Sequence, residues 1–376
     1  MNPTYLRKLR FLTLAVFLTT CSIVVTTAAP VPTQLTDAEF WRLSTTLSEP
    51  DGNFRSDNLL SNELNFQSVI PELLSVAQPG RVYMGVGPEQ NFTYIAALKP
   101  SMAFIIDIRH GNLDVHLLYK ALFEMSANRI EFVSKLFSLK QPEGLSPTTT
   151  ATQLFSAFGR QEATREQYES TLKAVIDHLK VTHKFPLSAG DEEGIKWALG
   201  NYFSFGPEIY YNASDANFAP EIVGVRDANG RRGGGRNSVA YSDLMTATDD
   251  PLGIGVQRSY LASEENFKVL KDLHSRNLIV PVVGDFGGPK AIQEVGKYLK
   301  SVGAMVSAFY LSNVEQYLEM DGKLDTFYSN VATLPIDDSS RFISTGSAGS
   351  GFGGGGGSMN TSRLRNMYAV TRAYAK

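Results

Sequence analysis

The stretch RVYMGVGPEQNFTYIAALKPSMAFIIDIR, residues 81–109, decides the fold. An apolar run leads into two glycines, Gly85 and Gly87. Pro88 then suits the first turn of a helix, because the N–H that proline lacks would have no partner there. A second apolar run ends on Asp107. This order predicts a strand, a tight turn, a helix and a parallel strand.

The glycine turn has the features of a ligand site. Glycines let a chain turn tightly and let a ligand approach the backbone, and the N-terminus of the next helix directs N–H groups at that space. Asp107 lies 20 residues after Gly87. In a nucleotide-binding βαβ unit, an acid at this distance accepts hydrogen bonds from a ribose. The third glycine of the G-x-G-x-x-G pattern is replaced by Gln90.

Composition places the chain among globular proteins. Its 376 residues are 43% hydrophobic and 19% charged, which is enough for one large domain or two ordinary ones. The formal net charge is -3, and no part of the chain forms a basic domain. A nucleic-acid partner is therefore disfavoured, and a small-molecule ligand is the expected partner.

Residues 1–30 have the pattern of a secretory signal. Three basic residues precede an apolar run, 11–25, and small residues follow at 27–29 as a cleavage point. We therefore expect export to the periplasm or envelope, with membrane contact only through this segment. An uncleaved membrane anchor and a lipidated Cys21 are the alternatives. Cys21 is the only cysteine, so the exported domain has no disulfide, which suits a bacterial envelope protein.

Residues 31–80 are predicted to form a helical N-terminal cap in at least two pieces. Asp37 caps the first, and Pro71 marks a helix start or break. The second piece carries apolar residues at helical spacing, which are Leu59, Leu60 and Leu64 and, further along, Val69, Leu73 and Leu74. Polar residues also cluster at 57–67, where they form either a solvated helix face or a lid over the glycine turn. After Asp107, Asn112 is the expected cap of a long amphipathic helix.

Residues 141–258 interrupt the regular pattern. A linker is followed by a helix near 162–179, a Gly-, Pro- and Tyr-rich segment and a flexible basic loop at 231–236. We predict an irregular insertion that caps one end of the sheet and shapes the substrate pocket. Its candidate substrate-binding residues are Tyr241, Asp243 and Arg258.

The regular pattern returns in residues 259–376, which together with 81–140 form the predicted sheet domain. A strand at 278–283 ends in Gly284-Asp285-Phe286, and a strand at 305–311 ends in Ser312-Asn313. The tail predicts a helix at 324–334, an edge strand at 341–344, a glycine-rich loop at 346–358 without fixed structure, and a final strand or helix at 363–374.

Three predicted strands thus end in polar residues at the same edge of the sheet, where open parallel sheets bind ligands. The expected fold class is α/β, Rossmann-like, with a mostly parallel sheet and helices on both faces.

The order of these features resembles the Rossmann-like class I methyltransferases that use S-adenosylmethionine, over about 55–137 and 260–345. In that family the glycine turn holds the methionine part of the cofactor and the acid after the second strand holds the ribose. An Asp after the third strand meets the adenine, and the end of the fourth strand faces the reacting centre. The resemblance implies these cofactor-binding residues: Gly85, Gly87, Glu89, Gln90, Asp107, Asp285, Phe286, Ser312 and Asn313.

The turn departs from that family at two positions. An acid usually precedes the first glycine by two residues, and a third glycine follows the second by two, where this chain has Tyr83 and Glu89. The chain is also similar to a group of bacterial proteins, largely without assigned function, that carry the segment V-Y-x-G-V-G-P-E-Q-N-F, residues 82–92 here. That similarity bears on the fold more than on the activity.

Other catalytic patterns are not found in the sequence. The five histidines show no H-E-x-x-H or similar spacing, so no metal site is expected. No G-x-S-x-G or G-x-x-x-x-G-K-[ST] motif occurs, and no catalytic residue is assigned.

The first function hypothesis is a methyltransferase-like enzyme that transfers a methyl group from S-adenosylmethionine to an unknown acceptor. The second is an exported, non-enzymatic ligand-binding or interaction protein that reuses the fold, because an exported domain would not meet a cytosolic cofactor. A nicotinamide-dependent reductase is third, since Asp107 suits NAD but no Tyr-x-x-x-Lys dyad is evident.

Overall fold

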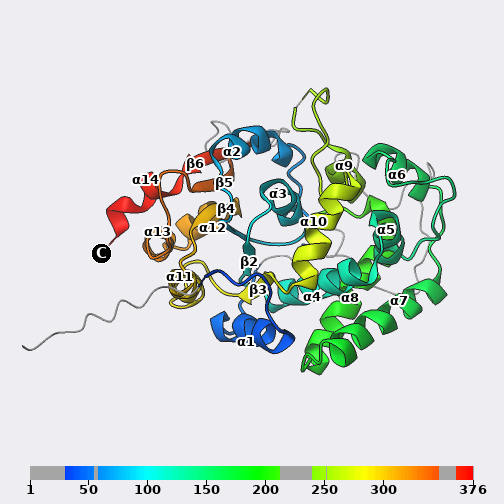
Figure 1. Ribbon diagram of the computed structural model, residues 1–376, viewed down its shortest axis with the longest axis horizontal. Helices are drawn as coiled ribbons and strands as arrows, with labels where there is room; N and C mark the ends of the chain where they lie inside the picture. The colour runs from blue at the N-terminus through cyan, green and yellow to red at the C-terminus, as the bar shows by residue number, and fades with distance from the viewer. Residues whose placement is uncertain (1–29, 55–57, 212–238, 251, 347–360, 376) are drawn as a thin grey trace, which may run out of the picture.

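Six strands form one central sheet in the part of the chain that the computed structural model describes, residues 30–54, 58–211, 239–250, 252–346 and 361–375 (Figure 1). The strands are β1 (Val82–Gly85), β2 (Met102–Asp107), β3 (Ile279–Val283), β4 (Val306–Ser312), β5 (Arg341–Gly346) and β6 (Thr361–Asn366). Their order is β3-β2-β1-β4-β5-β6. All neighbours run parallel except β5 and β6, which are antiparallel. The predicted α/β class with a mostly parallel sheet is confirmed.

Helices cover the sheet and extend beyond it on one side (Figure 1). Their bounds are α1 (Asp37–Leu47), η1 (Phe66–Val69), α2 (Ile70–Val76), α3 (Gln90–Leu98), α4 (His110–Met125), α5 (Arg129–Phe137), α6 (Ala151–Phe158), α7 (Arg165–Asp177), η2 (His178–Thr182), α8 (Ala189–Phe205), η3 (Gly206–Glu208), α9 (Tyr241–Thr246), α10 (Glu264–Ser275), α11 (Ala291–Ser301), α12 (Val314–Met320), α13 (Leu324–Val331), α14 (Met367–Thr371) and η5 (Arg372–Tyr374). Among the described residues, no helix has the length and apolar character needed to cross a membrane.

The βαβ unit of β1, α3 and β2 forms where the sequence predicts it. Both strands are buried along their whole length, as parallel strands covered on two faces should be. Helix α3 begins two residues after Pro88 and ends at Lys99, which adopts the left-handed conformation with φ 47°. Val82 pairs with Met102 in the parallel register.

Aromatic side chains fill the space between the sheet and its helices. On one face, Phe92 of α3 packs edge-to-face against Tyr119 of α4, with ring centroids 5.0 Å apart. On the other face, Phe104 of β2 meets Tyr298 of α11 at 5.8 Å. Phe309 of β4 lies against the same layer of helices, 6.3 Å from Phe327 of α13. The buried core is therefore continuous through the sheet.

The N-terminal segment is attached to β3, the strand at one edge of the sheet. Ser44 of α1 donates a hydrogen bond to the carbonyl of Pro281 at 2.5 Å. Ser48 Oγ accepts from the N–H of Val283 at 2.9 Å, and the N–H of Glu49 donates to the carbonyl of Val283 at 2.8 Å. Residues 37–49 therefore satisfy backbone groups of β3 that face away from β2.

Three predictions about the N-terminal half are wrong. Asp37 is the first residue of α1, and the cap is Thr36, whose side chain accepts from the Glu39 N–H at 3.2 Å. Leu59, Leu60 and Leu64 do not lie on a helix, because α1 ends at Leu47 and the described residues from there to η1 form an irregular loop. Leu73 and Leu74 do lie on a helix, α2, which begins one residue before Pro71 as the sequence indicates. Asn112 does not cap α4 but lies inside it, because the helix already begins at His110. The side chain of Asp51 accepts a hydrogen bond from the His110 N–H at 2.6 Å and takes the role expected of Asn112.

The region from 141 to 258 is mainly helical where it is described, so the expected irregular insertion is corrected. Helices α5, α7 and α8 lie together beside α4, and α6 contacts α9 (Figure 1). Tyr202 of α8 shares a hydrogen bond of 2.8 Å with Tyr119 of α4, which links this helical layer to the layer on the sheet. The predicted basic loop at 231–236 lies outside the described residues.

At the C-terminus, β5 is not an edge strand as predicted. The returning segment forms β6, which pairs with β5 over its whole length and takes the edge position. The predicted signal segment up to residue 29 and nearly all of the glycine-rich loop, residues 347–358, lie outside the described residues.

Candidate functional site

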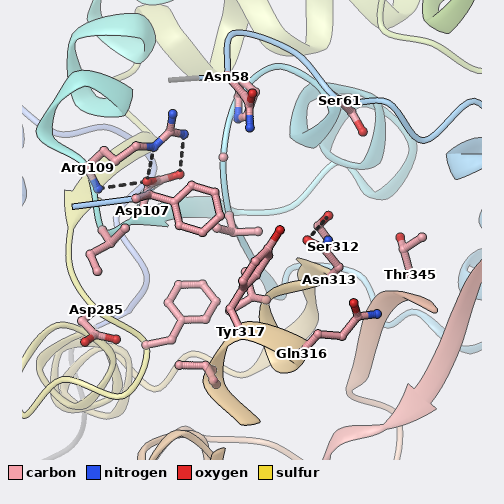
Figure 2. Close-up of a pocket in the computed structure, with 18 of the residues that line it drawn as sticks. Asn58, Ser61, Asp107, Arg109, Asp285, Ser312, Asn313, Gln316, Tyr317 and Thr345 are labelled. Carbon is pink, nitrogen blue, oxygen red and sulfur yellow. Dashed lines mark hydrogen bonds and ion pairs between the residues drawn. The ribbon is translucent and has the colours of Figure 1, made fainter. Parts of the chain in front are cut away.

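A cavity of about 670 Å³ opens at the carboxyl edge of the sheet. It lies over the ends of β1 and β4, which are neighbours although the chain leaves them toward opposite edges of the sheet. Open α/β sheets bind ligands at such a switch point, and the volume is typical of a small-molecule site. Figure 2 shows side chains from several strand ends around this one space.

Most of the predicted cofactor-binding residues line the cavity. They are Gly87, Gln90, Asp107, Asp285, Phe286, Ser312 and Asn313. Gly85 and Glu89 do not line it, and neither do the candidate substrate residues Tyr241, Asp243 and Arg258. The cavity therefore unites three strand ends that are far apart in the sequence.

The glycine turn is held from behind by Asn91. Its amide nitrogen donates to the carbonyls of Val86 at 2.9 Å and Pro88 at 2.7 Å, and its amide oxygen accepts from the Tyr83 hydroxyl at 2.8 Å. A Cβ on Gly85 would lie 1.9 Å from that amide oxygen. Gly85 therefore leaves room for the Asn91 side chain that fixes the turn. Its role is in packing and not in lining the cavity.

Gly87 is required for a different reason. Its φ of +75° lies in the left-handed region, where side chains cost free energy. His116 Nε2 lies 3.0 Å from the Gly87 carbonyl, so this nitrogen carries the proton and donates it. Burial lowers the pKa of His116 to about 4, which keeps the ring neutral. The turn is thus supported by two buried side chains rather than by the ligand.

Asp107 ends β2 and is held by Arg109. The guanidinium Nε and Nη2 lie 3.0 Å from Asp107 Oδ1 and Oδ2, and the Arg109 N–H donates to Oδ1 at 2.9 Å (Figure 2). Both side chains are largely buried. Arg109 also lines the cavity, so it presents a cation beside the acid that the sequence identified.

Asp285 and Phe286 follow β3. Asp285 Oδ1 accepts from the Gly287 N–H at 2.9 Å, and Oδ2 lies 2.6 Å from the ammonium of Lys323, an exposed residue just before α13. Phe286 is stacked against Phe327, with ring centroids 5.6 Å apart. Phe286 therefore forms a rigid apolar wall at this end of the cavity. Asp285 places a charged group at its rim.

The end of β4 brings a buried acid into contact with Ser312. Ser312 donates its hydroxyl proton to Oε1 of Glu63, a side chain that is only 2% exposed and lines the cavity. Burial raises the pKa of Glu63, although the hydrogen bond from Ser312 and the nearby hydroxyls of Thr345 and Tyr310 act in the opposite direction. Ser312 has a φ of +51°, which is unusual for a residue with a side chain and marks a constrained position.

Four buried oxygen atoms of cavity-lining residues have no hydrogen-bond partner among the described residues. They are Asn58 Oδ1, Glu63 Oε2, Gln90 Oε1 and Thr345 Oγ1. Gln90 donates through its nitrogen to the Tyr310 hydroxyl at 2.8 Å, which leaves its oxygen free to accept. Buried polar atoms without partners are uncommon in proteins, and here the amide and carboxylate oxygens can only accept hydrogen bonds, whereas the Thr345 hydroxyl can also donate one. The cavity therefore suits a ligand that is rich in N–H or O–H donors.

Glu89 lies away from the cavity, in a buried cluster with four tyrosines, Tyr119, Tyr202, Tyr241 and Tyr260. Burial raises its pKa to about 8, so the carboxyl is protonated at neutral pH. Tyr241 belongs to the same cluster and shares a hydrogen bond with Tyr260. Asp243 accepts from the Ala240 N–H at the start of α9, and Arg258 pairs with Asp249. Tyr241, Asp243 and Arg258 therefore have structural partners outside the cavity.

Sequence reasoning missed many residues of the cavity, including Asn58, Glu63, Arg109 and Tyr317, which carry polar groups. For Asn58 and Glu63, the polar cluster at 57–67 was the available signal. Asn58 and Ser61 of that cluster line the cavity and lie across it from α12, which contributes Tyr317 (Figure 2).

Two groups of histidine and acidic side chains come together outside the cavity, although the spacing of the histidines gave no indication of either. Glu124 contacts His178 and His183, and His110 lies beside Asp114 and Asp191. In each group, one nitrogen or oxygen atom from every residue lies within 4.8 Å of the others, which is close enough for a shared ion.

A family model for a domain of unknown function, DUF7790, matches residues 59–187 and 249–360. The chain belongs to this family. The two DUF7790 segments contain β1 to β5 and most of the residues that line the cavity, including Glu63, Asp107 and Ser312. No curated protein matches the chain. The cavity is therefore built mainly from the part of the chain that defines the family.

Proposed function

We propose that this DUF7790 protein is a Rossmann-like, methyltransferase-like enzyme that binds S-adenosylmethionine in the central cavity and transfers its methyl group to an acceptor. The strand order β3-β2-β1-β4-β5-β6 supports the Rossmann-like part, because doubly wound nucleotide-binding sheets share it. The position of the cavity at the switch between β1 and β4 supports a nucleotide ligand.

The observation that carries the proposal is the excess of hydrogen-bond acceptors in a cavity of suitable size. Four buried oxygens lack partners among the described residues, and three of them are amide or carboxylate oxygens that can only accept. Four acids line the cavity against two bases, Arg109 and Lys323. S-adenosylmethionine has an ammonium group, ribose hydroxyls and an adenine amino group, all of them donors, and a positively charged sulfur. The residues present therefore fit this cofactor in size, hydrogen bonding and charge.

The resemblance to class I methyltransferases suggests which residues would bind each part of the cofactor. The turn at Gly87 would hold the methionine part, Asp107 the ribose, and Asp285 with Phe286 the adenine. Asp107 can accept from ribose hydroxyls only if it shares its oxygens with Arg109 or exchanges them. Ser312 and Asn313 would face the reacting centre.

Bound S-adenosylmethionine would supply a methyl group on a positively charged sulfur, open to attack by a lone pair of the acceptor. Glu63 is the residue placed to take the proton that an O–H or N–H acceptor must lose, since it is buried beside Ser312 and has one oxygen free. Burial raises its pKa, which makes its carboxylate a stronger base. The Ser312 hydroxyl orients that carboxylate by donating to the other oxygen.

Calorimetry with S-adenosylmethionine and with its demethylated product tests the proposal. We expect both to bind the purified protein, and Asp107→Ala to weaken both by about tenfold, equivalent to about 1.4 kcal/mol. Asp243→Ala is the matched control, because this acid lies outside the cavity and should leave binding unchanged. Absence of binding by both compounds would reject the proposal.

An exported, non-enzymatic binding protein is the second candidate, and one observation favours it. Arg109 already occupies both oxygens of Asp107, an arrangement that suits a ligand other than a ribose. Under this alternative, the mature protein would be found outside the cytoplasm without residues 1–30. Cell fractionation with mass spectrometry of the N-terminus distinguishes the two, since an uncleaved cytosolic chain contradicts export.

A further inference from the structure

His110, Asp114 and Asp191 come together where two helices begin. His110 is the first residue of α4, Asp114 lies one turn later, and Asp191 belongs to the first turn of α8. His110 Nε2 lies 2.7 Å from Asp191 Oδ1 and 3.8 Å from Asp114 Oδ1. These residues join the helix that packs on the sheet to the helical layer beside it.

Asp114 is the unusual member of the group. Its side chain is only 4% exposed, and its Oδ1 has no hydrogen-bond partner among the described residues. Helix α8 passes directly over the carboxylate, since a Cβ on Gly194 would lie 2.1 Å from Asp114 Oδ2. A buried carboxylate oxygen without a donor costs free energy, so its position calls for a partner.

The surroundings are short of positive charge. Asp51 adds a third carboxylate, whose Oδ1 accepts from the backbone N–H of His110. In the described part of the chain, no lysine or arginine forms an ion pair with Asp51, Asp114 or Asp191. Burial, together with the charges of Asp191 and Asp51, raises the pKa of Asp114 to about 8, against the opposing effect of His110. A bound cation would remove this imbalance.

The first turn of a helix also stabilises acids, which could explain Asp191. Its Oδ2 accepts from the Ser188 N–H at 2.6 Å in a capping box. That explanation does not extend to Asp114, which lies in the second turn of α4 and makes no such contact. The free oxygen therefore needs a separate cause.

We propose that His110, Asp114 and Asp191 bind a divalent transition-metal ion. The donor set is one imidazole nitrogen and two carboxylate oxygens, all within 4.8 Å of one another. Ligand bonds of about 2.0–2.2 Å to a shared ion are compatible with that spacing. The imidazole favours Zn²⁺ or Mn²⁺ over Mg²⁺ and Ca²⁺, which prefer oxygen ligands alone. The ion would fasten α8 to α4 one residue beyond Arg109 of the cavity.

The second histidine group serves as the matched control. Glu124 Oε2 accepts from His178 at 2.7 Å and from His183 at 2.6 Å, while Oε1 pairs with the ammonium of Lys120 at 2.6 Å. This carboxylate already has three donors, one of which is the cationic Lys120. It therefore has no need of a metal ion, although its residue types are those of a metal site.

Calorimetric titration of the full-length protein, freed of metal by a chelator, with Zn²⁺ and separately with Mn²⁺ tests the site. We expect one ion to bind per chain and to raise the unfolding temperature. Asp114→Asn and His110→Ala should each weaken binding by about tenfold or more, whereas His178→Ala should leave it unchanged. Asn has the shape of Asp without its charge, and His110 is partly exposed, so circular dichroism of both variants should match the parent.

Two results would overturn the proposal. One is the absence of saturable binding by either ion to the parent protein. The other is binding that survives both Asp114→Asn and His110→Ala but is lost in His178→Ala, since the ion would then occupy the Glu124 group.

Discussion

Arg109 holds Asp107 at both carboxylate oxygens although the two residues are only two positions apart in the chain. The Asp107 side chain is 6% exposed and that of Arg109 is 11% exposed. The pair therefore lies in a poorly solvated place at the rim of the cavity, where water screens the attraction between the two charges only weakly.

Replacing Asp107 with Asn should destabilise the protein by about 2–3 kcal/mol, because the nearly buried guanidinium of Arg109 would lose its two ionic contacts with Asp107. Asp285→Asn is the matched control at the next strand end. Its partner Lys323 is 46% exposed, so the cost should be about 0.5 kcal/mol. Urea unfolding measures both, and equal losses would contradict this account.

Two glycine substitutions should have effects of opposite sign. Gly85→Ala places a methyl group where the Asn91 oxygen lies, so the turn loses its hydrogen bonds at a cost of about 2 kcal/mol. Gly111→Ala adds a methyl group in open space within α4 and should stabilise the helix by about 0.5–1 kcal/mol. Thermal unfolding of both variants checks the pair. Destabilisation by Gly111→Ala would mean that the space beside Gly111 is not open.

Glu89→Gln should stabilise the protein at alkaline pH. Burial raises the folded-state pKa of Glu89 to about 8, well above the ordinary value of 4.5, so the folded protein binds this proton more tightly than the unfolded chain. The contribution is therefore fully present below pH 4.5 and is lost as pH rises toward 8, at about 1.4 kcal/mol per pH unit. Glutamine removes this loss. Unfolding free energies of both proteins from pH 5 to 9 should diverge, and parallel curves would exclude the effect.

His183→Gln should be most harmful in mildly acidic solution. Nδ1 of His183 faces Asp37 Oδ1 at 2.7 Å and Nε2 faces Glu124 Oε2 at 2.6 Å, so both nitrogens must donate and the ring is charged. Burial acts to lower the pKa of His183, but Glu124 and Asp37 outweigh it and the pKa is raised. Its stabilisation is complete below the unfolded value near 6.5 and is lost as pH rises through the folded pKa.

We expect His183→Gln to cost about 2 kcal/mol at pH 6 and progressively less at higher pH. Chemical unfolding of the parent and the variant at several pH values measures this difference. A cost that stays constant from pH 6 to pH 9 would mean that the ring is neutral in the folded protein.

The unit of β1, α3 and β2 is predictable from sequence because its signals are local. The apolar runs, Gly87 and Pro88 each determine the conformation of adjacent residues. The position of Asp107 follows from the strand that it ends. The second half of the sheet follows from the same signals. For this reason three strand ends of the cavity could be identified before their arrangement was known.

The loop before η1 could not be predicted in the same way. Leu59 and Leu60 are buried, whereas Leu64 is exposed, so their spacing reflects no common helix face. Glu63 gains its importance from Ser312, which is 249 positions away, and His110 from Asp191, 81 positions away. Contacts between residues so far apart depend on the packing of whole helices and strands. They cannot be predicted from the spacing of residue types along the chain.

The attachment of residues 37–49 to β3 has a consequence for solubility. A strand at the edge of a sheet normally presents free N–H and C=O groups that can pair with another molecule. Here the carbonyl of Pro281 and both backbone groups of Val283 are occupied by Ser44, Ser48 and Glu49, and proline has no N–H to offer. The N-terminal segment thus protects β3 from edge-to-edge aggregation. A chain shortened past Glu49 would expose backbone groups of β3 that can pair with a strand of another molecule.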